Sequence, residues 1–321
     1  MAAWQRRRHQ RPVYDPAFGD TALAEGREDM LLGRWEGARD LLARIPGDWD
    51  RRAHRIRLLA DAAAGRRTVD LWQASEPRNP DAAVLRAETE VMRMFAAARA
   101  GQTVGRERLE RTAWFCHRAA ELAPADPYPW VSLLSLGRLH PGGHPEMSVW
   151  WQEIVGRDPY HREGHHQALR YLSARWHGSY GTALNFAWDV SCSAPQGSPL
   201  AVLALVARAE HYPHRVRTEG RAALGLAHHW SDGRACADLR NALDQWIAHR
   251  VPGAQDVADL NYLAHGLVKA GMSDRAGVVF RLLDNRATAA PWSYTGDPEQ
   301  LFIRWRDATA AGSGGDVESK A

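Results

Sequence analysis

The chain has 321 residues, of which 45% are hydrophobic and 25% charged, and its basic and acidic residues leave a net charge of +3. This composition is typical of a globular protein with a sizeable core. Arginines interleaved with Asp and Glu argue against a nucleic-acid partner. Two basic clusters stand out, at residues 6–11 and 51–57, and the second is expected to spread around a helix and be partly solvated. Almost every base is arginine and Ala and Gly are plentiful, which indicates a GC-rich, actinobacterial genome.

The sequence also carries no signal for a membrane or for secretion. Its longest apolar run, residues 200–207, is far shorter than the roughly 20 residues that a membrane helix needs. The three cysteines, Cys116, Cys192 and Cys236, are widely spaced and form no CxxC pair, so no disulfide framework or cysteine-rich zinc site is predicted. We therefore expect a cytoplasmic protein without a cofactor, in which Cys116 and Cys192 are small buried side chains.

Proline-containing breaks recur along the first two thirds of the chain at intervals of about 35 residues, with one longer interval. Proline ends a helix interior but fits the first turn of the next helix, so the spacing predicts successive helix pairs. The breaks are centred on Pro46, Pro80, Pro124, Pro159 and Pro195.

Between the breaks, apolar residues follow the helical period. Met147, Trp150, Trp151, Ile154 and Val155 form a complete stripe at positions i, i+3, i+4, i+7 and i+8. No sustained alternation of apolar and polar residues indicates a strand. The predicted fold class is all-α, an α-α superhelix built as a solenoid of helix pairs.

Two resemblances follow from these residues. Gly33, Ala38 and Pro46, and the segment 119–130, resemble the tetratricopeptide family, although the period drifts and several units lack the family's Tyr and Gly positions. This likeness implies a concave helical surface that binds a protein or peptide. Residues 155–213 resemble an uncharacterised bacterial helical domain with a Trp-X-Gly-Ser turn, here at residues 176–179. In this turn we expect Gly178 to be a left-handed C-cap and Ser179 the next N-cap.

The pattern predicts four parts along the chain. Residues 1–17 are expected to be flexible, and residues 18–213 to form the tetratricopeptide-like array. After residue 214 the repeat gives way to other helices, so residues 214–310 are predicted to be a C-terminal helical cap. The Gly/Ser-rich residues 311–321 are predicted to be a disordered tail.

A histidine group is the candidate for chemistry. His161 and His165 are spaced i, i+4, the spacing of metal-binding helices, with Glu163 between them. No third ligand is fixed by spacing, and polar residues are also ordinary at the start of a helix. Recognised catalytic motifs are absent, and Glu88, Glu90 and Glu121 are expected on solvated helix faces.

The fourteen tryptophans are the other unusual feature, and packing between helices accounts for most of them. Some are expected to anchor a partner on the concave surface, together with Tyr and Arg. The candidates are Tyr128, Trp130, Trp151 and Arg175. The sequence therefore predicts a non-enzymatic interaction or scaffold module with a protein or peptide partner. The alternative is a helical metal-binding protein or enzyme that uses His161 and His165.

Overall fold

The computed structural model describes residues 10–45, 47–220 and 224–312. Contacts divide the chain into two compact units. We call Gly19–Gly178 the 19–178 unit. We call Ser179–Ala321, together with Met1–Phe18, the 179–321 unit, as far as its residues are described.

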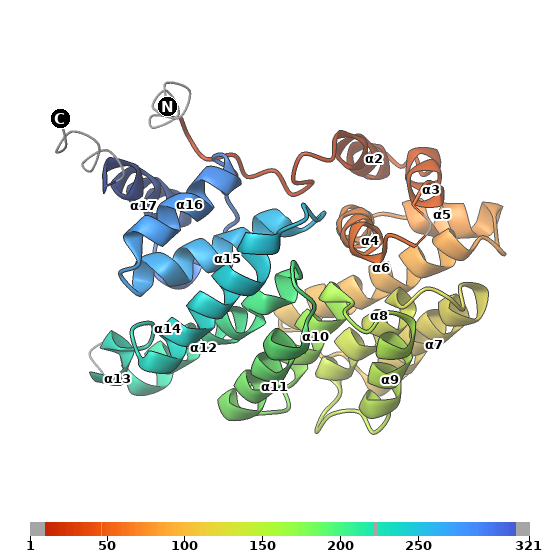
Figure 1. The fold of residues 1–321 in the computed structure, drawn as a ribbon. Helices are drawn as coiled ribbons and strands as arrows, with labels where there is room; N and C mark the ends of the chain where they lie inside the picture. The colour runs from red at the N-terminus through yellow and green to blue at the C-terminus, as the bar shows by residue number, and fades with distance from the viewer. Residues whose placement is uncertain (1–9, 46, 221–223, 313–321) are drawn as a thin grey trace, which may run out of the picture. The chain divides into compact units, whose positions relative to one another are not determined.

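The predicted all-α fold is confirmed. The described residues contain no strand, only an isolated bridge between Val13 and Arg286. Helices pack mainly against their neighbours in sequence, as helix pairs do, and Figure 1 shows this succession along the chain.

The 19–178 unit contains helices of very different length, from eight to twenty residues. They are α2 (Thr21–Leu31), α3 (Glu36–Ala43), α4 (Trp49–Ala63), α5 (Thr68–Ser75), α6 (Pro80–Arg99), α7 (Arg106–Leu122), α8 (Tyr128–Leu136), α9 (Met147–Arg157) and α10 (Arg162–Tyr171).

The helices of the 179–321 unit are more irregular, with short 3₁₀ or π segments between some of them. They are α11 (Tyr180–Ser193), α12 (Leu203–Glu219), α13 (Leu224–Ala227), α14 (Gly233–Asn241), α15 (Asp256–Lys269), α16 (Ser273–Leu283) and α17 (Pro298–Gly312). A 3₁₀ turn, η6 (Trp292–Tyr294), precedes α17.

The proline breaks fall at helix boundaries. Pro80 is the first residue of α6, and the side chain of Asn79 caps that helix by accepting from the backbone N–H groups of Asp81 and Ala82. Pro124, Pro159 and Pro195 lie between helices, and Pro46 lies outside the described residues.

The contacts group residues differently from the predicted parts. Residues 179–213 join the C-terminal helices, and position 213 lies inside α12. Residues 1–9 and 313–321 lie outside the described residues. Near the N-terminus, the Val13 N–H donates to the Asn285 carbonyl at 2.9 Å, and the Ala287 N–H donates to the Val13 carbonyl at 2.9 Å. The domain boundaries stay predictions.

The basic cluster at residues 51–57 spreads around α4 as predicted, with Arg51 and Arg57 partly exposed. Arg52 and Arg55, however, are buried. Arg52 donates from Nε to Asp126 and from Nη2 to Asp81, both at 2.7 Å. Arg55 donates to Asp20 at 2.8 Å. The helix that carries them, α4, packs against both α2 and α6, so these positions do not reach solvent and carboxylates compensate their charge.

Two further expectations concern small residues. Cys116 is buried as predicted, but Cys192 is exposed, because it lies one turn after the exposed Trp188 on α11. Ser179 caps α11 as predicted, accepting from the Thr182 N–H at 3.1 Å. Gly178 is not left-handed. Position 178 needs a glycine for a steric reason, because a Cβ atom there would lie 2.1 Å from the Leu172 carbonyl oxygen.

Candidate functional site

Both histidines proposed as metal ligands take part in the start of α10. His161 is the N-cap, and its Nδ1 accepts from the Gly164 N–H at 3.0 Å. Nδ1 of His165 lies 2.9 Å from the His161 carbonyl oxygen and therefore donates to it. Both rings are buried, and burial lowers the pKa of His161 to about 4 and also lowers that of His165. Among the described residues, no three or more His, Cys, Asp or Glu side chains group in a way that could hold a metal ion. The metal pair stays a prediction.

The same helix buries a carboxylate. Oε2 of Glu163 accepts from Arg57 of α4 at 2.9 Å, and Oε1 accepts from Gln167. Burial would raise the pKa of Glu163, but the nearby guanidinium groups of Arg57, Arg170 and Arg162 lower it to about 2. The Arg57 side chain is 39% exposed, so this ion pair joins the core to the surface.

A second buried carboxyl group behaves in the opposite way. Glu88 of α6 accepts a hydrogen bond from the Ser132 hydroxyl at 2.7 Å, and burial raises its pKa to about 7. The expectation that Glu88 lies on a solvated face is wrong, because α6 packs against α4, α7 and α8. Glu121 is exposed as predicted, whereas Glu90 is mostly buried and pairs with Arg93 at 2.6 Å. Glu88 and Glu163 are both buried in the core, which favours a structural role for them.

The four predicted partner-binding residues lie in different surroundings. Tyr128 is in the core and only 1% exposed, and burial raises its pKa. Trp130 is half-buried, with the Arg157 guanidinium 5.5 Å from its ring. Trp151 is also half-buried and contacts the His165 ring edge-on at 5.0 Å. Arg175 is exposed and lies over the Trp176 ring at 5.7 Å.

Several aromatic side chains lie on α7 and the start of α8, and the sequence singled out only one of them. Trp114 is 60% exposed and contacts the Phe115 ring at 5.1 Å. His117, one turn further along, meets Trp130 of α8 edge-on at 5.9 Å. We call Trp114, Phe115, His117 and Trp130 the α7 aromatic surface. It includes one of the four predicted residues, Trp130.

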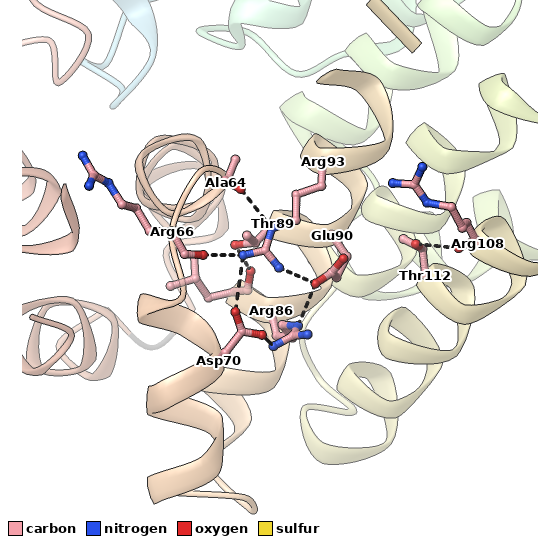
Figure 2. A network of polar contacts seen from close by, with 10 residues as sticks. Ala64, Arg66, Asp70, Arg86, Thr89, Glu90, Arg93, Arg108 and Thr112 are labelled. Carbon is pink, nitrogen blue, oxygen red and sulfur yellow. Dashed lines mark hydrogen bonds and ion pairs between the residues drawn. The ribbon is translucent and has the colours of Figure 1, made fainter. Parts of the chain in front are cut away.

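A network of ion pairs holds the arginine that packs against the Phe115 ring. The Arg86 guanidinium lies 4.7 Å from the centre of the Phe115 ring and is held by Asp70 and by Glu90. Arg93 donates to Glu90 and to the Ala64 carbonyl, at 2.6 and 3.0 Å. Figure 2 shows these groups gathered between α5 and α6. The guanidinium that packs against Phe115 is therefore held by two carboxylates.

The exposure of Trp114 could have been found from the sequence. The buried residues of α7 form one stripe, namely Leu109, Thr112, Cys116, Ala119 and Ala120. At 3.6 residues per turn, position 114 falls on the opposite side of the helix from this stripe. By contrast, the burial of Glu88 and Glu163 could not be predicted from the neighbouring residues, because it depends on helices that are distant in sequence.

No helix among the described residues is long and apolar enough to cross a membrane. Comparison with known protein families matches no family model, and a search of curated proteins finds no match.

Proposed function

We propose that the chain is a non-enzymatic interaction module, in which the 19–178 unit forms a divergent tetratricopeptide-like array. This unit binds a partner protein or peptide through the α7 aromatic surface. The observation that carries the proposal is Trp114, a large indole that is 60% exposed on the side of α7 opposite its buried stripe. Tryptophan is enriched among the residues that dominate binding energy at protein interfaces.

The surroundings of Trp114 support this role. Its neighbour Phe115 is held by Arg86, which is itself fixed by Asp70 and Glu90. Side chains that are already held in place before binding lose less conformational entropy when a partner docks. Stacked helix pairs commonly provide such surfaces, which fits an interaction module.

We also propose that the module acts in the cytoplasm. Cys116, Cys192 and Cys236 are all free thiols, and free thiols persist in a reducing compartment.

Site-specific crosslinking in the native cell tests the interaction. A photoreactive residue at Arg118, one turn from Trp114 and exposed, should capture one defined partner. The same residue at Leu32, which is also exposed but lies on α2, should not capture it. Trp114→Ala should abolish the crosslink at position 118.

Trp188→Ala is the matched control, because Trp188 is another exposed tryptophan, in the 179–321 unit. This variant should leave the crosslink unchanged. Capture of the same proteins at positions 32 and 118, or a crosslink that persists in Trp114→Ala, would overturn the proposed function.

A further inference from the structure

An imidazole with unsatisfied hydrogen-bonding groups lies in the core of the 179–321 unit. His265 of α15 is 1% exposed, and in the described part of the chain neither of its ring nitrogens has a hydrogen-bond partner. The rings of Trp230 and Trp292 contact it edge-on at 5.3 and 5.2 Å. Burial lowers the pKa of His265 to about 3, so the ring is neutral, with one N–H and one lone pair available.

The two tryptophans differ in their own hydrogen bonds. Nε1 of Trp292 donates to the Asn261 side chain at 2.8 Å, which fixes that ring. Nε1 of Trp230 is buried and, like the nitrogens of His265, has no partner among the described residues. Leaving a buried donor unsatisfied costs stability, so two such neighbours in one core call for an explanation.

A cation lies one turn further along the same helix. Lys269 follows His265 at i+4, which puts the two on one face of α15, and Lys269 is half-buried. No hydrogen bond or ion pair of Lys269 is found in the described structure, and the charge acting on it comes from Arg304 of α17, another cation. Burial and Arg304 together lower the pKa of Lys269. Lys269 lies in the last turn of α15, where a cation is favourable, but this does not account for His265 and Trp230.

We propose that the 179–321 unit binds an oxyanion, the carboxylate or phosphate group of a small ligand, at Lys269, Arg304, His265 and Trp230. Lys269 and Arg304 neutralise its charge, and the N–H groups of His265 and Trp230 donate hydrogen bonds to it. Each of the four groups is a donor or a cation, so an anionic oxygen acceptor is the complement that they share. This site is separate from the α7 aromatic surface and does not depend on the proposed function.

Thermal unfolding of the full chain in buffer free of oxyanions, with inorganic phosphate or acetate added, tests the proposal. One of these probes should raise the Tm of the wild type, and which one does so distinguishes a phosphate ligand from a carboxylate ligand. Lys269→Met and Arg304→Met should each weaken the response about tenfold, as expected when a charged partner is lost. Arg275→Met, which removes an exposed arginine of α16, should respond like the wild type.

NMR of lysine side chains gives a second readout, because the chain has two lysines, Lys269 and Lys320. Probe binding should raise the pKa of Lys269 and leave that of Lys320 unchanged. His265→Phe should raise the Tm of the protein without probe, since the ring shape stays and the two unsatisfied nitrogens go. It should also weaken the probe response. If neither probe raises the wild-type Tm, or if all variants respond as Arg275→Met does, the site does not exist.

Discussion

Two carboxyl groups in the core of the 19–178 unit show how neighbours decide the state of a single residue. Glu163 has guanidinium groups around it, and its pKa falls to about 2. Glu88 has a serine hydroxyl as its hydrogen-bond donor, and burial raises its pKa to about 7. Glu163 is therefore charged at neutral pH, whereas Glu88 is near its midpoint.

Glu88→Gln should stabilise the protein above pH 7. The folded-state pKa of Glu88 lies above its ordinary value of 4.5, so the folded state holds more protons and loses stability as pH rises from 4.5 to 7. The difference between the two pKa values corresponds to a loss of about 3 kcal/mol in the free energy of unfolding at pH 8. The neutral amide of Gln avoids this loss, and its oxygen can still accept the hydrogen bond from Ser132. Urea unfolding at pH 8 and pH 5 measures it.

The gain of Glu88→Gln should shrink at pH 5, where Glu88 of the wild type is mostly protonated. Glu121→Gln is the control, because Glu121 is exposed, and it should change stability little at either pH. An equal effect of Glu88→Gln at both pH values would contradict the assigned protonation.

At the scale of elements, α4 and the turn after α10 each depend on one geometric constraint. Arg52 ties α4 to the first turn of α6 through Asp81 and to the turn before α8 through Asp126. Gly178 lies against the backbone of Leu172 after α10 ends. The first constraint joins segments distant in sequence, whereas the second acts within a single turn of the chain.

Arg52→Met should destabilise the protein by about 3–5 kcal/mol, because it leaves two carboxylates, one of them fully buried, without their cation. Chemical denaturation of the purified variant measures this loss. Arg51→Met, at the neighbouring exposed position, should cost less than about 1 kcal/mol. Similar losses of stability in the two variants would show that the ion pairs of Arg52 with Asp81 and Asp126 are not the cause.

Gly178→Ala should destabilise the turn, since the new Cβ would overlap the Leu172 carbonyl and force the backbone to move. A loss of about 2 kcal/mol or more is expected in thermal unfolding. Gly156→Ala in α9 is the matched control, because nothing lies near its Cβ position. That substitution should be neutral or stabilise by up to about 1 kcal/mol.

Over the whole molecule, buried neutral histidines make both units sensitive to acid. The pKa values of His161 and His229 are lowered to about 4 and that of His265 to about 3, each mainly by burial. His161 lies in the 19–178 unit and the other two in the 179–321 unit.

Stability should fall as pH drops from about 6.5 toward 4. The unfolded state binds protons on these histidines below its ordinary pKa of about 6.5, whereas the folded state does not. Each histidine contributes about 2 kcal/mol to this loss at pH 5, and together they outweigh the opposite effect of Glu88. Urea unfolding between pH 7 and pH 5 measures the slope, and a stability that rises toward pH 5 would contradict the prediction.

Much of the architecture was predictable because it depends on local periodicity. The apolar stripe of α9, the proline at the start of α6 and the Ser179 cap are set by residues close in sequence. The opposite face of α7, which exposes Trp114, follows from the same period.

What the sequence alone determined about this protein is thus an all-α chain of helix pairs and the ends of several helices, because these follow from contacts within a few residues. The tertiary structure decided which polar side chains are buried. Arg52 and Glu88 resemble ordinary solvated helix residues in sequence, and partners 74 and 44 residues away enclose them. The isolation of His265 between two tryptophans likewise exists only once α15 and its neighbours have packed together.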